Sequence, residues 1–189
     1  MSEYPTYEVP PSKEAEVAVP YEELEREEWE RMAVAAEQNT CQIVGENQIS
    51  KWYKWVLPSR YIPILRNAGP CSAAQIIDTE GNTALAHFTP DIDAETIRKL
   101  MDGRQIQQGK ILIPMKPSAL FVPAHFRKKV EFFRTLGLTP VMPKYIDDKG
   151  LPTVVNMLMD AENHRVVSGI TYDASFPNMV PHYKAAFTE

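Results

Sequence analysis

Short hydrophobic runs separated by clusters of turn-forming residues dominate the chain from about residue 60 onward. The runs at 72–78 (SAAQIID) and 83–88 (TALAHF) flank a Thr-Glu-Gly-Asn segment, whose glycine and asparagine suit a tight turn. We therefore predict an antiparallel hairpin. KILIP at 110–114 has the length and composition of a further buried strand, and TPVMPKYI, TVVNMLMD and HRVVSGITYD predict strands toward the C-terminus.

Two other segments show helical spacing. Within 124–136, Phe126, Val130 and Phe133 fall on one face and charged residues occupy the other. A shorter helix is predicted near 93–102, capped by an aspartate and ended by a glycine. Strands joined by hairpins, without regular βαβ repeats, indicate an α+β fold with a mixed, largely antiparallel sheet layered with helices. We expect one compact sheet between about residues 60 and 172.

The N-terminal part of the chain has a different character. Residues 1–19 are rich in proline and glutamate, which predicts an extended or disordered acidic arm. Residues 20–39 are mostly strong helix formers, with Pro20 at a suitable first position, and predict an acidic helix. That helix either packs on its own domain or binds a partner, and the arm is a candidate partner-binding segment. Residues 50–189 then form the main domain.

Charge and composition exclude several functions. Residues 1–39 carry a net charge of −8, which leaves +3 for the other 150 residues because the whole chain carries −5. Because these 150 residues have so small a net positive charge and no clustered Lys/Arg runs, we expect no nucleic-acid binding. Two cysteines outside any CxxC and four scattered histidines predict neither a structural zinc site nor a cofactor.

The expected location follows from similar arguments. No apolar run approaches the roughly 20 residues that a membrane-spanning helix needs, so we expect no membrane span. The first residues lack the positively charged and apolar regions of a Sec signal. We therefore expect a cytoplasmic protein, or one delivered into a host cell without a Sec signal.

One pair of residues suggests chemistry. Cys71 opens the first strand of the predicted hairpin and His87 lies near the end of the second, so both occupy the same end. Pairing about the turn places His87 three residues from direct register with Cys71, a gap that a β-bulge would close. An imidazole within hydrogen-bond reach takes the proton of a thiol and holds a nucleophilic thiolate. The alternative is a buried cysteine beside an ordinary core histidine.

The segment RNAGPCSAAQIIDTEGNTALAHFTPD, which contains both residues, resembles the catalytic hairpin of the chemoreceptor glutamine deamidases (CheD). In that family a Gly-Ser-Cys opens a strand, and after a turn the next strand ends in Ala-His before an apolar-Pro stretch. The deamidase domain of the cytotoxic necrotizing factors uses a similar Cys and His. The resemblance covers roughly residues 60–172. It implies an α/β/α-type sandwich, with Cys71 as nucleophile and His87 as base.

The sequence departs from the CheD pattern in three respects, one of which is that Pro114-Met115-Lys116-Pro117-Ser118 replaces the family's Gly-Gly segment after KILIP. Pro70 replaces the serine before the cysteine, and Leu65 stands where the family has the hydroxyl residue that supports the histidine. Asn67 and Ser72 are the neighbouring candidates for that supporting role, and a backbone carbonyl is a third option.

The resemblance implies a hydrolase that converts glutamine side chains of a partner protein to glutamate, and we expect it to act as a stand-alone or host-directed effector. Transglutamination is a close variant, because an amine can intercept the same thioester. A papain-like protease using His164 or His182 is a further option. The alternative class is a non-catalytic protein-interaction module on a deamidase-like scaffold, with Trp52 and Trp55 or the arm as its contact surface.

Overall fold

A computed structural model describes residues 20–39, 41–54, 62–115, 123–144 and 146–188. The strands form two sheets of five strands each. In spatial order, the first sheet contains β1 (Tyr21–Leu24), β10 (Arg165–Asp173), β9 (Leu151–Asp160), β4 (Ile62–Ala68) and β2 (Cys41–Ile43). The second contains β3 (Gln48–Ile49), β6 (Thr83–Phe88), β5 (Ser72–Asp78), β7 (Ile106–Leu112) and β8 (Leu138–Pro140).

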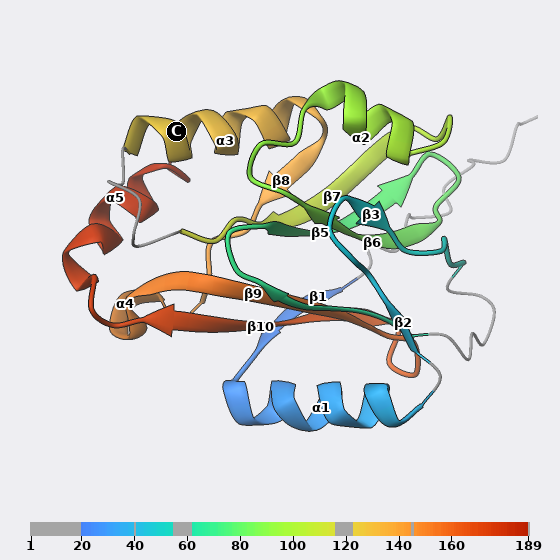
Figure 1. Cartoon of the computed structure of the whole chain (residues 1–189), viewed down its shortest axis with the longest axis horizontal. Helices are drawn as coiled ribbons and strands as arrows, with labels where there is room; N and C mark the ends of the chain where they lie inside the picture. The colour runs from blue at the N-terminus through green and yellow to red at the C-terminus, as the bar shows by residue number, and fades with distance from the viewer. Residues whose placement is uncertain (1–19, 40, 55–61, 116–122, 145, 189) are drawn as a thin grey trace, which may run out of the picture.

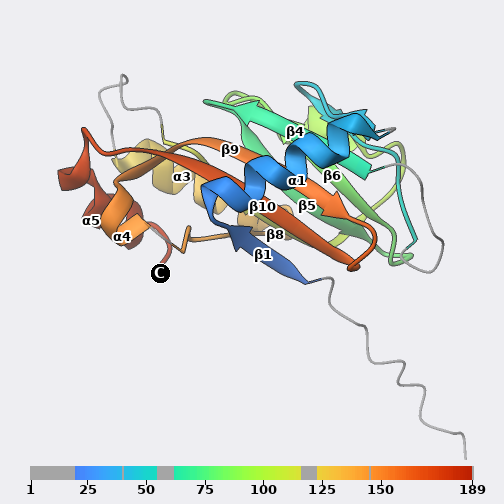
Figure 2. The same cartoon turned by 90° about the horizontal axis from the view of Figure 1, so that it is seen from below.

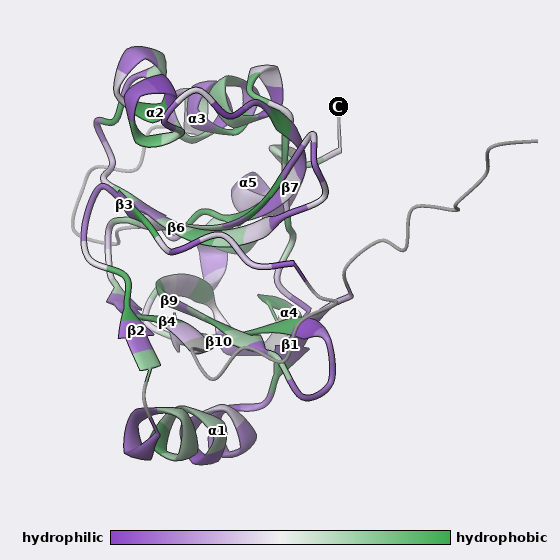
Figure 3. Cartoon of the chain, turned by 90° about the vertical axis from the view of Figure 1, so that its right-hand side faces the viewer, coloured by the Kyte–Doolittle hydropathy of each residue, from purple (hydrophilic) through white to green (hydrophobic). Residues whose placement is uncertain are grey.

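The described helices are α1 (Arg26–Gln38), α2 (Ala94–Leu100), α3 (Pro123–Thr135), α4 (Ile146–Lys149), η1 (Pro177–Met179) and α5 (Val180–Ala185). Helices α1, α2 and α3 cover the outer faces of the stacked sheets. Figure 3 shows four layers: α1, the first sheet, the second sheet, and then α2 with α3. Figure 1 shows α4 and α5 together at one end of the stack. None of the described helices is long and apolar enough to cross a membrane.

The predicted α+β class, with mixed sheets layered with helices, is confirmed, whereas the expectation of one sheet is wrong because the strands form two sheets. The α/β/α-type sandwich that the resemblance implies therefore has two sheets between its helix layers. The chain crosses from one sheet to the other between β4 and β5, within the three residues 69–71. All residues of β5 and β6 are buried, because one face of their sheet packs against the first sheet and the other against helices. A strand that is buried on both faces has a mostly apolar sequence, whether helices or a second sheet cover it. The sequence of β5 and β6 therefore does not distinguish one sheet from two.

The hairpin of β5 and β6 is confirmed, with Ser72 opposite Phe88 and Ile77 opposite Thr83. Its turn is held by Asp78, whose carboxylate accepts hydrogen bonds from the backbone N–H groups of Glu80 and Asn82. Gly81 supplies the left-handed backbone that the turn requires, at φ 77°.

Both predicted helices of the body are also confirmed. Phe126, Val130 and Phe133 of α3 are buried over the second sheet. Helix α2 is shorter than predicted, and Asp93 caps it by accepting a hydrogen bond of 2.7 Å from the backbone N–H of Thr96.

The prediction of a helix over 20–39 is wrong at its start. Residues Tyr21–Leu24 form β1, which pairs in parallel with β10, and α1 begins only at Arg26. The backbone N–H of Val166 donates to the carbonyl of Pro20 at 2.8 Å, so sheet hydrogen bonds replace the helical ones. Pairing with a strand some 145 residues away outweighs local helix propensity here.

Helix α1 belongs to the fold of the main domain. It lies across the outer face of the first sheet (Figure 2) and buries Trp29, Ala33 and Ala36 there. This confirms packing on its own domain. Arg66 of β4 binds Glu30 and Glu37 of the helix at 2.8 Å each. The predicted arm at 1–19 and the possible contact residue Trp55 lie outside the described residues.

Candidate functional site

Cys71 lies where the chain passes between the sheets. Immediately before it, Asn67 adopts a left-handed backbone conformation (φ 56°) and donates its N–H to the side-chain carbonyl of Asn156 at 2.7 Å. This fixes the end of β4 against β9, and Gly69 and Pro70 then lead to Cys71. The cysteine is only 3% exposed and packs in the core between the two sheets, with Ala73 and other apolar residues.

His87 lies on the same inner face of the hairpin. It stands directly opposite Ala73 on β5, so it is two residues from register with Cys71, closer than the three residues that the sequence predicts. Diagonal neighbours of this kind have Cα atoms about 7–8 Å apart across an antiparallel pair. The register of β5 and β6 therefore places Cys71 and His87 at the same end of the inner face of the hairpin, and no bulge is needed.

The hydrogen bonds of His87 leave one nitrogen of the ring unused. The side chain is 6% exposed, and its Nδ1 lies 3.3 Å from the carbonyl oxygen of Val44. Its Nε2 is buried and has no hydrogen-bond partner among the described residues. If Nδ1 carries the proton and donates to Val44, Nε2 is left as an unused acceptor.

The predicted Cys71–His87 hydrogen bond at a solvent-accessible edge is wrong for this conformation. The thiol instead lies 4.0 Å from the Glu46 carboxylate, at the hydrogen-bond limit for sulfur, and it is buried. The physical reason is that the first sheet covers this face of the hairpin. The inner face of the hairpin meets the β9 and β4 strands and not solvent, so a residue on that face is covered.

Besides the nearby Glu46 carboxylate, Asp91 and Lys129 influence the Cys71 thiol electrostatically. Burial raises the pKa of the Cys71 thiol, Glu46 and Asp91 raise it further, and Lys129 of α3 lowers it. Burial in turn lowers the pKa of Lys129 to about 8, against the opposing influence of Cys71 and Asp91. Charged groups from three separate segments therefore influence a thiol that packs among apolar residues.

Sequence reasoning missed Glu46, Asp91 and Lys129. Glu46 reaches Cys71 because the loop between β2 and β3 is tied to the end of β6. There, the side-chain carbonyl of Asn47 accepts hydrogen bonds from the N–H and the hydroxyl of Thr89, each 3.0 Å long. No spacing motif encodes this contact. The nearest signal is the turn-forming Gly-Glu-Asn segment before β3.

The two predicted supporting residues are not brought to His87. The side chain of Asn67 is exposed at the end of β4. Ser72 follows Cys71 along the strand, so its side chain points to the opposite face, toward the helix layer. Its hydroxyl is fully buried there and has no hydrogen-bond partner among the residues that the structure describes. The carbonyl of Val44, the backbone option, is the group that lies beside His87.

The distant histidines do not adjoin Cys71 in the fold. His164 lies in the turn between β9 and β10, at the far end of those strands from the Gly69 contact with Val154. His182 lies on α5, which packs against α3 in the helix layer. The papain-like arrangement therefore finds no support in these positions.

No protein-family model matches the sequence, and no curated protein matches it either. Within the described part of the chain, no group of three or more His, Cys, Asp or Glu side chains is placed to hold a metal ion.

Proposed function

We propose that this protein hydrolyses glutamine side-chain amides of a partner protein, with Cys71 as nucleophile and His87 as base. The observation that carries the proposal is the buried Nε2 of His87, which has no hydrogen-bond partner in the described part of the chain and shares a face and an end of the hairpin with Cys71. Leaving a buried polar atom unpaired costs about 1–3 kcal/mol. A nitrogen reserved for the thiol proton accounts for that cost.

Reaction begins with a change at Cys71. Its side chain turns from Glu46 toward His87, which is a rotation about a single torsion between staggered positions. Nε2 takes the thiol proton, and the ammonium of Lys129 favours the resulting thiolate. Burial is the main reason that the pKa of the thiol is raised, and moving the thiol away from the Glu46 carboxylate removes the second of its causes.

The remaining steps follow from the chemistry of amides. The thiolate attacks the carboxamide carbon, and backbone N–H groups near Cys71 are the candidate donors to the developing oxyanion. His87 protonates the departing nitrogen, so ammonia leaves and a thioester remains. Water, deprotonated by His87, then cleaves the thioester and releases glutamate and the free thiol. The net reaction consumes one water and releases one ammonia.

The test is deamidation mapping by mass spectrometry in a cell lysate incubated with the protein. Wild type and Cys41→Ser should convert the same glutamines to glutamate, because Cys41 lies on the edge strand β2 of the first sheet. Cys71→Ser and His87→Gln should lose this activity by at least ~100-fold, since a general base or nucleophile contributes that much or more. Conversion that persists in Cys71→Ser would contradict the proposal.

One observation favours a second candidate, a non-catalytic interaction module. Cys71 is 3% exposed, and burial raises the pKa of its thiol, which is the opposite of what an activated nucleophile shows at rest.

Alkylation separates the two candidates. If Cys71 is catalytic, turning toward His87 makes its iodoacetamide labelling near pH 7 faster than that of Cys41, and His87→Gln abolishes the difference. Peptide mapping measures both rates in one sample. Equal labelling of the two cysteines, or slower labelling of Cys71 that is insensitive to His87→Gln, would favour the module.

A further inference from the structure

A cavity of about 310 Å³ lies at the edge of the first sheet, away from the Cys71 site. Strand β1 pairs with β10 only from Val166 to Gly169, and after Leu24 the chain turns into α1. Strand β10 continues to Asp173, so its last residues have no partner strand on that side among the described residues. The start of α1 and the end of α4 close the space that remains.

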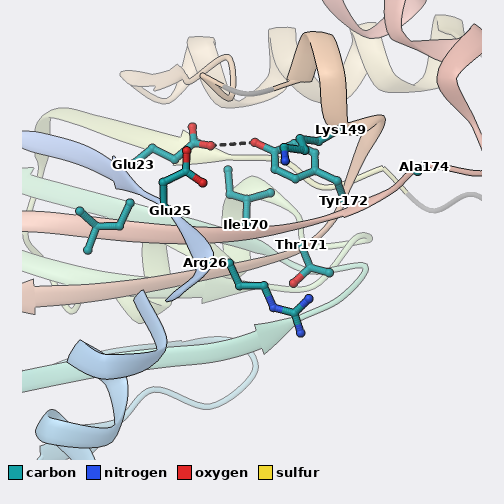
Figure 4. A pocket seen from close by; sticks show the side chains of 9 residues that line it. Glu23, Glu25, Arg26, Lys149, Ile170, Thr171, Tyr172 and Ala174 are labelled. Carbon is teal, nitrogen blue, oxygen red and sulfur yellow. Dashed lines mark hydrogen bonds between the residues drawn. The ribbon is translucent and has the colours of Figure 1, made fainter. Parts of the chain in front are cut away.

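The cavity contains a buried carboxylate. Glu23 is 8% exposed, and it accepts a hydrogen bond of 2.7 Å from the hydroxyl of Tyr172 and one of 2.6 Å from the backbone N–H of Lys144. Figure 4 shows the carboxyl groups of Glu23 and Glu25 beside each other, with the tyrosine hydroxyl bonded to the first. A carboxylate has about four lone-pair directions, so Glu23 retains acceptor capacity.

Two cations line the same cavity. Arg26 opens α1 and Lys149 ends α4, and both side chains are exposed to solvent. In Figure 4 the Arg26 side chain extends on the other side of the cavity from Glu23, near the hydroxyl of Thr171. Negative and positive groups are therefore separated, with Leu24 and Ile170 supplying apolar wall between them.

We infer that this cavity binds a small zwitterionic amino acid, with its ammonium at Glu23 and Glu25 and its carboxylate at Arg26. Burial and, to a smaller extent, the neighbouring Glu25 carboxyl raise the pKa of Glu23, against the lowering influence of Lys144 and of the Tyr172 hydroxyl. A ligand ammonium beside the two carboxyl groups would offset the repulsion between them. The volume lies at the lower end of ligand pockets, which is the range for a molecule with few heavy atoms. A ligand with only a positive or only a negative charge would pair with the charged groups on one side of the cavity alone.

Calorimetric titration with 4-aminobutanoate, butylamine and butanoate tests this inference on the full chain. The zwitterion should bind at least ~10-fold more tightly than either one-ended compound, which corresponds to one lost charge contact of about 1.4 kcal/mol. Butylamine binding as tightly as 4-aminobutanoate, or no heat from any of the three, would overturn the inference.

Matched variants locate the site. Glu23→Gln should weaken 4-aminobutanoate binding at least tenfold, with Glu27→Gln on the exposed face of α1 as its control. Arg26→Met should also weaken 4-aminobutanoate binding at least tenfold, with Arg31→Met as its control. Because Arg26 is exposed, its substitution tests the site even if Glu23→Gln disturbs folding. Unchanged affinity in Arg26→Met would place the ligand elsewhere. Deamidation tests Cys71 independently, so either claim can fail alone.

Discussion

At the residue scale, Asp78 shows how one side chain fixes the hairpin. Burial alone would raise the pKa of its carboxyl, but hydrogen bonds from the side chain and backbone of Asn82, and from Arg104, lower it overall. Asp78 itself is 1% exposed, and Arg104 also lies over the ring of Trp52 at 5.0 Å. One aspartate thus joins the turn, the β6–β7 region and the segment before β4.

This network makes stability depend on pH. A carboxyl whose pKa is lower in the folded than in the unfolded state stabilises the fold above its unfolded pKa near 3.9. That stabilisation is lost as pH falls through the lowered folded pKa. We therefore expect the free energy of unfolding in urea to fall between pH 5 and pH 3, and to fall less in Asp78→Asn. An equal fall in both proteins would show that other carboxyl groups dominate acid unfolding.

At the element scale, α1 meets its sheet at a glycine. A Cβ added at Gly169 of β10 would lie 2.2 Å from Cγ of Trp29, far inside contact distance. The indole therefore occupies the space that a side chain would take, and the helix packs close to the strand. This contact makes the acidic helix an integral part of the first sheet, although its sequence alone permits a loosely docked segment.

Gly169→Ala should accordingly destabilise the protein. Overpacking of this kind costs about 1–3 kcal/mol. Gly69→Ala is the matched control, because its added Cβ would meet its nearest neighbour at 3.5 Å, an ordinary contact, and should cost under about 1 kcal/mol. Urea denaturation measures both. Equal effects would show that α1 shifts freely to accommodate a methyl group.

The elements that sequence predicts correctly are those with local causes. The β5–β6 hairpin has its turn residues between its strands, and α3 has its own apolar stripe. Strand β1 has no such local signal, because its hydrogen bonds come from β10 at the other end of the chain. The helix-forming composition of residues 21–24 therefore misled the prediction.

At the scale of the whole molecule, stacking of two sheets decides the state of the candidate site. Sequence correctly places Cys71 and His87 at one end of one hairpin. It does not reveal that the first sheet covers that face, that Glu46 reaches the thiol through the Asn47–Thr89 contact, or that Lys129 approaches from α3. Each of these depends on segments that meet only in the folded chain.

The most direct test of the proposed function is hydrolysis in water enriched in ¹⁸O. Lysate proteins are incubated with wild type, Cys41→Ser, Cys71→Ser or His87→Gln, and peptides are analysed by mass spectrometry. We predict new glutamates, each carrying one ¹⁸O atom at a former glutamine, with wild type and Cys41→Ser only. Labelled glutamates at the same positions with Cys71→Ser, or none with folded wild type, would contradict the assignment of Cys71 and His87 as a deamidating pair.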